Sequence, residues 1–212
     1  HNLNFFNEDI HLFFYFLTVI IIFLIFFNFD NNFSVLLLSL TSSVSNIGIS
    51  LNNNPKNLSF IFLILVIIGG SFFSTSSGIR FLKIYSLLRY SINEILSYSK
   101  PKKIYINKHL FSNDFFQLDE IYKYFLSIII FIISLLLLVV LLTLNGIEFE
   151  SSFKLSILTL MNTVNSSMYG LGDFSFYDLH FFTKYCLIIF MIIGRVELLT
   201  LLIISKKFLF KN

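Results

Sequence analysis

The stretches SLTSSVSNIG at residues 39–48 and TLMNTVNSSM at residues 159–168 read almost alike, with small polar residues at matching places. Each lies between two long apolar runs and is too short and too polar to cross a bilayer. Irregular polar backbone is tolerated at membrane depth only where it faces protein or water, and there its carbonyl groups can coordinate an ion. The repeat therefore predicts a protein that conducts ions through a membrane.

The composition places most of the chain in lipid. Of the 212 residues, 56% are hydrophobic and 13% are charged, and the mean hydropathy is +0.83. A soluble domain with so much apolar surface would aggregate. Cys186 is the single cysteine, which excludes an internal disulfide and a cysteine-based metal site. We therefore expect an all-α membrane protein without a cofactor or a nucleic-acid partner.

Hydropathy predicts four helices that are long enough to cross a membrane. They run from about Ile10 to Phe29, Leu58 to Tyr90, Ile121 to Leu144 and Phe181 to Ile204. Two further helices, Phe33 to Ser43 and Ser151 to Thr163, would extend only about 16–20 Å and can enter the membrane without crossing it.

This pattern predicts two units, each made of a membrane helix, a pore helix with a re-entrant filter loop, and a second membrane helix. The units are residues 1–98 and 121–212, and a basic loop at residues 99–120 joins them. Because basic residues concentrate between Arg80 and Lys123, the positive-inside rule puts this loop in the cytoplasm and both pore loops outside. We expect a multi-pass protein of the plasma (inner) membrane.

The residues after the two short helices are the candidate ion site. A short helix that enters from outside directs the partly negative end of its dipole toward the bilayer centre, which favours a cation there. Glycine in such a loop permits backbone angles that other residues avoid. The alternative is a re-entrant loop that only packs. The candidate filter residues are Ser45, Asn46, Ile47, Gly48, Asn165, Ser166, Ser167 and Met168.

The second predicted span is interrupted by a stretch rich in glycine and serine, which disfavours a straight helix. We interpret this stretch as a flexible gate below the filter; the alternative is a kinked helix. Its residues are Gly69, Gly70, Ser74, Thr75, Ser76, Ser77 and Gly78.

Arg195 falls near the middle of the fourth predicted span, where a charge is expensive and indicates a function. It could form an electrostatic barrier under the filter or belong to a structural ion pair. Glu197 is two positions away on another helix face and is not an obvious partner.

His109 and Asp114 have the His-x-x-x-x-Asp spacing of membrane glycerolipid acyltransferases, in which histidine acts as a base. No glycine-rich phosphate-binding stretch follows them, so we expect no enzyme activity; a membrane acyltransferase that uses His109 and Asp114 is the alternative function from another class.

Three segments together resemble the TrkH type of the Trk/Ktr/HKT superfamily of potassium transport proteins, whose members join four membrane-pore-membrane units in one polypeptide. The segment from Ile68 to Arg80 is similar to the gating loop of the third unit. Asn165 to Gly172 resembles the fourth filter, and Met191 to Glu197 resembles the Gly-Arg-Leu-Glu signature of the last helix. Since the chain begins at His1 and lacks the first two units, we expect it to be the C-terminal half of a longer protein.

The resemblance implies a potassium pathway, an intramembrane gating loop and an arginine that narrows the pore. It also implies a homodimer and a cytosolic TrkA-like nucleotide-binding regulatory subunit. Met168 stands where the resemblance places a filter glycine, so the preference for potassium over sodium is open. Either Met168 adopts glycine-like backbone angles at about 1–2 kcal/mol, or Gly170 supplies the turn in a shifted register.

Two other interpretations of the two-unit pattern remain. A tandem-pore potassium channel also has four spans and two pore loops, but its filter should read Thr-x-Gly-Tyr-Gly, and neither loop does. A non-conducting, degenerate paralogue is the other, and Met168 is the residue that favours it.

Overall fold

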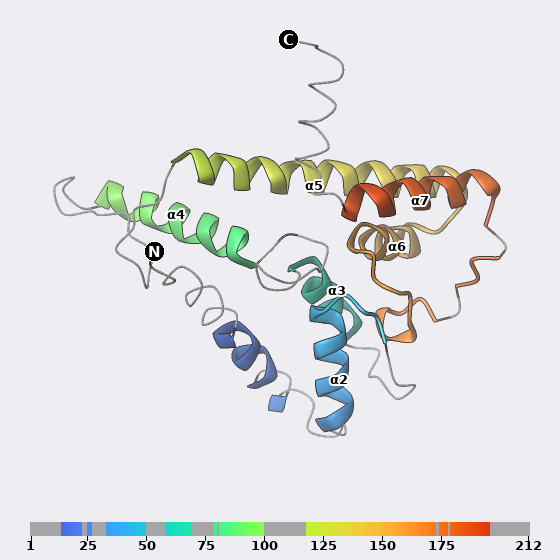
Figure 1. The fold of residues 1–212 in the computed structure, drawn as a ribbon, viewed down its shortest axis with the longest axis horizontal. Coiled ribbons are helices and arrows are strands. Elements are labelled where there is room, and N and C mark those ends of the chain that lie inside the picture. The colour runs from blue at the N-terminus through green and yellow to red at the C-terminus, as the bar shows by residue number, and fades with distance from the viewer. Residues whose placement is uncertain are drawn as a thin grey trace, which may run out of the picture.

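The computed structural model describes residues 14–22, 25–26, 33–49, 58–68, 79, 81–99, 118–172, 174–177 and 179–195. Every regular element in these residues is a helix, so the all-α prediction is confirmed for this part of the chain. The labelled helices are α2 (Phe33–Val44), α3 (Ser59–Ile68), α4 (Phe81–Ser99), α5 (Leu118–Leu144), α6 (Phe149–Met161), the 3-10 helix η2 (Ser167–Tyr169) and α7 (Phe181–Arg195) (Figure 1).

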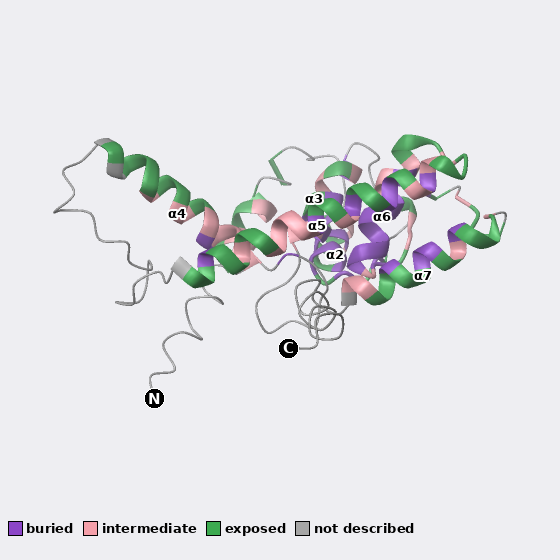
Figure 2. Cartoon of the chain, turned by 90° about the horizontal axis from the view of Figure 1, so that it is seen from above, coloured by how far each residue is buried: buried purple, intermediate pink, exposed green. Residues whose placement is uncertain are grey.

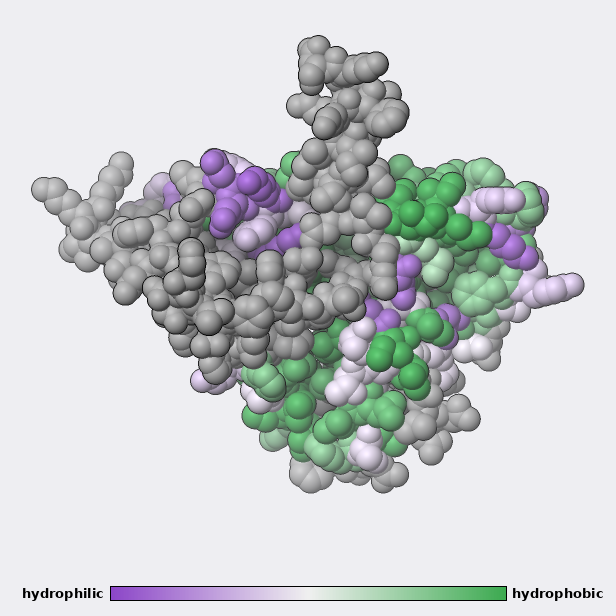
Figure 3. All heavy atoms as spheres, in the orientation of Figure 1, coloured by the Kyte–Doolittle hydropathy of each residue, from purple (hydrophilic) through white to green (hydrophobic). Residues whose placement is uncertain are grey.

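Among the described helices, α5 alone is both long and apolar enough to cross a membrane. Its 27 residues extend about 40 Å at the rise of an α-helix. Leu138 and Leu142 are fully buried against the rest of the fold, whereas Ile133 and Leu137 on the outer face are exposed. Figure 3 shows hydrophobic side chains over much of the described surface. An apolar outer face on an already packed helix fits a lipid surrounding.

The short helix α6 lies in the middle of the fold and packs on α5, α7 and α3 (Figures 1 and 2). It is buried continuously from Leu155 to Met161. Ser156 and Thr159 are buried too, because their hydroxyls donate hydrogen bonds of 2.7 Å to carbonyl oxygens four residues earlier in the helix. These two buried hydroxyls of α6 therefore have hydrogen-bond partners without water.

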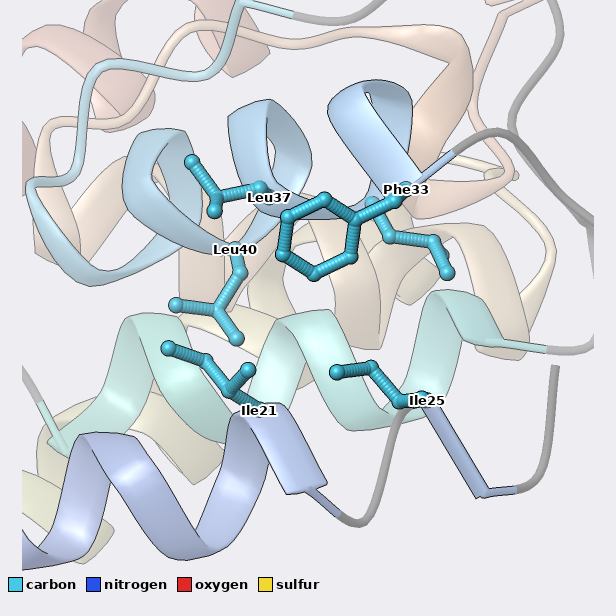
Figure 4. Close-up of a pocket in the computed structure, with 6 residues that line it drawn as sticks. Ile21, Ile25, Phe33, Leu37 and Leu40 are labelled. Atoms are coloured by element: carbon cyan, nitrogen blue, oxygen red, sulfur yellow. The ribbon is translucent and has the colours of Figure 1, made fainter. Parts of the chain in front are cut away.

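The other short helix, α2, packs on α3. On another side it meets the first described segment of the chain, where Ile21 and Ile25 point toward Phe33, Leu37 and Leu40 (Figure 4). The space left between these side chains is only ≈10 Å³. Helix α2 is thus held by apolar contacts with chain segments that precede and follow it.

The described helices match the two predicted short helices and the third predicted span, and they differ from the second predicted span at its end. The short helices appear as α2 and α6, and the third span appears as α5. The predicted second span, Leu58 to Tyr90, covers α3 and the first part of α4, which continues to Ser99; residues 69–78 lie outside the described residues. The first span is described only at residues 14–22 and 25–26, the fourth span only to Arg195, and the basic loop only at its helical ends.

Candidate functional site

Helices α2 and α6 end in the same way, at an asparagine with left-handed backbone angles. Asn46 has φ 57° and Asn162 has φ 53°. After α2 the Ile47 N–H donates to the Ser42 carbonyl at 3.0 Å, and after α6 the Thr163 N–H donates to the Leu158 carbonyl at 2.9 Å. This bond closes a Schellman-type helix end, in which asparagine is the usual substitute for glycine. We call residues 45–48 the α2 loop and residues 162–168 the α6 loop.

The two loops touch each other directly. The Val164 N–H donates to the Ile47 carbonyl at 3.4 Å. Gly48, with φ 84°, lies so close to the other loop that a Cβ there would overlap the Val164 carbonyl oxygen and lie 2.9 Å from its carbon and nitrogen. Only glycine fits this position. The sequence repeat had suggested Gly48 for its backbone angles, and the structure adds the close approach.

Buried oxygen atoms gather at the ends of the two short helices. The Thr163, Asn165 and Ser166 side chains of the α6 loop each carry a buried oxygen that has no hydrogen-bond partner among the described residues, and so does Ser42 of α2. The Asn165 amide is fixed by donating from Nδ2 to the Leu171 carbonyl at 3.1 Å. A buried acceptor without a donor costs free energy that a bound cation would recover.

The backbone at Met168 is not glycine-like. Met168 lies in η2, does not have a positive φ, and its side chain is only 2% exposed. Gly170 has φ 76° and ends η2. Of the two alternatives left open by the sequence, the structure therefore has the left-handed turn at Gly170, and the expected backbone strain at Met168 is absent.

The helix ends also give a register different from that of the sequence repeat. Because Asn46 corresponds to Asn162, Gly48 corresponds to Val164, not to Met168. The two corresponding residues are the ones that meet.

Asn162 also joins the α6 loop to α7. Its Nδ2 donates to the Met191 carbonyl at 2.9 Å. One turn further along α7, a Cβ on Gly194 would overlap the Leu160 carbonyl oxygen and lie 2.9 Å from its carbon. The sequence reading missed Asn162, although an asparagine directly after an apolar helix is a signal for a helix end.

One charged pair lies near the α6 loop. Lys154 forms an ion pair with Glu150 in the first turn of α6, and its hydrogen bond lowers the pKa of that carboxyl. The Lys154 ammonium lies 3.1 Å from where a Cβ on Gly170 would be. A positive charge thus accompanies the turn that follows the candidate filter.

A cavity of ≈560 Å³ opens between α6, α7 and the α6 loop. Its polar lining residues are Thr159, Thr163, Asn165 and Lys184, and the other lining residues are apolar. In the described part of the chain, no group of three or more His, Cys, Asp and Glu side chains could hold a metal ion.

Several predicted residues cannot be placed. The candidate gate at residues 69–78, together with His109 and Asp114, lies outside the described residues. Arg195 ends the described part of α7, directly after Gly194, and only its backbone belongs to that part.

Comparison with known protein families identifies the family of this chain. The family model TrkH, described as a cation transport protein, matches residues 49–210. The chain belongs to the TrkH family. No curated protein sequence matches it. TrkH proteins are membrane cation transporters and not enzymes, which agrees with the predicted class. The TrkH match includes the α6 loop and Gly194 but begins just after the α2 loop.

Proposed function

We propose that this TrkH-family chain transports a monovalent cation, potassium, through a pore lined by the α2 and α6 loops. The observation that carries the proposal is the contact between these loops. The Val164 N–H bonds to the Ile47 carbonyl, and Gly48 lies against the Val164 backbone. Two short helices thereby direct their partly negative ends to one place, which favours a cation there.

The chemistry of the loops suits a potassium ion. Their buried side-chain groups include hydroxyl and amide oxygens. Such oxygens, together with backbone carbonyls, are neutral ligands that can replace the hydration shell of an alkali cation. The Ile47 carbonyl already accepts a bond from Val164, so we assign ion contacts to the carbonyl and side-chain oxygens of the other filter residues.

The remaining parts of the proposal follow the family resemblance. Helices α2 and α6 serve as the pore helices of re-entrant loops, in the third and fourth of four units. The stretch at residues 69–78 and Arg195 gate the path below the filter. The chain works as a homodimer in the plasma (inner) membrane, with the basic loop in the cytoplasm facing a TrkA-like nucleotide-binding subunit.

Uptake by the full-length protein tests the function. Rubidium, as a substitute for potassium, and sodium are offered to liposomes that contain the purified protein, and protein-free liposomes provide the background. We expect rubidium uptake to exceed sodium uptake. Equal uptake of both ions would contradict potassium selectivity while leaving cation transport in place.

A second candidate is a non-conducting paralogue; its argument from the sequence was Met168, and the left-handed turn at Gly170 removes the backbone strain on which that argument rested. It predicts a protein that reaches the membrane and takes up neither ion above background.

A further inference from the structure

We propose that Asn162 is a positioning residue that fixes the α6 loop to α7 and thereby sets the ion selectivity of the pore. The inference rests on the proposed role of the α6 loop as part of the filter. It goes beyond that role because neither Asn162 nor the contact with α7 belongs to the ion-lining set.

The geometry places Asn162 at the start of the loop with two separate tasks. Its left-handed backbone ends α6, and its N–H donates to the carbonyls of Leu158 and Thr159. Its side chain, which the helix end does not need, donates from Nδ2 to the Met191 carbonyl 29 positions away in the chain. The second task links two elements that meet only in the folded protein.

A second contact between α6 and α7 lies about one turn further along α7. Gly194 lies against the Leu160 carbonyl so closely that no side chain fits between the helices there. The hydrogen bond at Met191 and the contact at Gly194 are about one helical turn apart, so together they fix both the height and the rotation of α7 relative to the end of α6.

The loop that follows carries a buried polar group directly next to Asn162. Among the described residues, the Thr163 hydroxyl has no hydrogen-bond partner, and its position therefore depends on the backbone that begins at Asn162. A small displacement of α7 at Met191 changes the start of this backbone. Selectivity is sensitive to such shifts because it depends on the number and placement of the coordinating oxygens.

The test variant is Asn162→Gly in the full-length protein, because glycine keeps the left-handed backbone and removes only the amide. The control is Asn145→Gly, which removes the same side chain after another helix, although Asn145 does not have a positive φ. Its amide donates to the Leu141 carbonyl of its own helix, α5, at 2.7 Å, a bond that joins no second element. Gly194→Ala provides a second test, because a methyl group on Gly194 of α7 would push the helix away from the Leu160 carbonyl of α6.

Two measurements are made on each variant. The ratio of rubidium to sodium uptake is determined in liposomes, and amide hydrogen exchange is measured over residues 163–168. Asn162→Gly should lower the uptake ratio about 2- to 10-fold, the effect of one lost hydrogen bond. Gly194→Ala should lower it at least as much, because its Cβ would overlap the Leu160 carbonyl oxygen, and both variants should speed exchange in the α6 loop. Asn145→Gly should change neither quantity.

The outcomes separate this inference from the proposed function. An unchanged uptake ratio in both variants, with wild-type exchange in the loop, would overturn the positioning role. Absence of both variants from the membrane would also overturn it and assign Asn162 and Gly194 to folding. If the unmodified protein takes up both ions equally, its proposed potassium selectivity fails and cation transport stays in place. Faster hydrogen exchange of the α6 loop in the Asn162→Gly variant would in that case still support the link to α7.

Discussion

Gly48→Ala should disable the pore through a clash that the structure locates on a single peptide group. The added methyl would overlap the Val164 carbonyl oxygen and lie 2.9 Å from the Val164 nitrogen and carbon. The obstacle is backbone, which cannot rotate away as a flexible side chain could. The α2 and α6 loops would have to separate, and the hydrogen bond from Val164 to Ile47 would break.

The size of the effect can be worked out in parts. Alanine in the left-handed region costs about 1–2 kcal/mol, and losing the hydrogen bond between the loops costs about 0.5–1.5 kcal/mol. Repacking around the inserted methyl adds about 1–3 kcal/mol. Together these changes lower the free energy of unfolding by about 3–6 kcal/mol, of which backbone strain is the smaller share.

A matched control isolates the contact from the strain. Gly146, at the end of α5, has the same φ of 84°, and nothing lies within 4 Å of the place that a Cβ would occupy. Gly146→Ala should therefore lower stability by about 1–2 kcal/mol and leave uptake per molecule in the membrane unchanged. Rubidium uptake and the thermal unfolding temperature in detergent are measured for both variants. Equal behaviour of the two variants would refute the reasoning, because strain alone would then explain Gly48.

Two other residues give predictions of their own. Met168→Gly should not raise the ratio of rubidium to sodium uptake, because the left-handed turn is at Gly170. It should lower the free energy of unfolding by about 2–5 kcal/mol through loss of a buried side chain. A raised uptake ratio would instead support the interpretation that Met168 occupies a position that requires glycine-like backbone angles. Arg195→Ala should increase cation uptake without changing the amount of protein in the membrane, since a positive charge in a pore opposes a cation. A reduced amount in the membrane, measured by immunoblot, would favour a structural ion pair.

The sequence predicted the elements that depend on local composition. The apolar run of α5 and the short runs of α2 and α6 are fixed by hydropathy and length, and the described helices begin and end close to the predicted residues. Membership of the TrkH family was likewise predicted from the Gly-Ser and Gly-Arg segments, and the family comparison confirms it.

The parts that the sequence did not predict depend on contacts between backbones. An asparagine side chain that reaches the Met191 carbonyl leaves no pattern of spacing or hydropathy, because any residue supplies a carbonyl. The register of the two loops was misjudged for a similar reason. Similar letters aligned Gly48 with Met168, whereas the helix ends align it with Val164.

The contact between the loops explains why corresponding positions hold such different residues. Gly48 turns its backbone into the contact, so a side chain there would strike the Val164 carbonyl. Val164 meets Gly48 through its peptide group and leaves its side chain 66% exposed, so a branched residue is tolerated. When two backbone segments lie this close together, only one of the two residues in contact has to be glycine. Both short helices therefore end at a left-handed asparagine. Two residues after that asparagine the loops differ, because Gly48 would direct a side chain into the other loop and Val164 directs its side chain away from it.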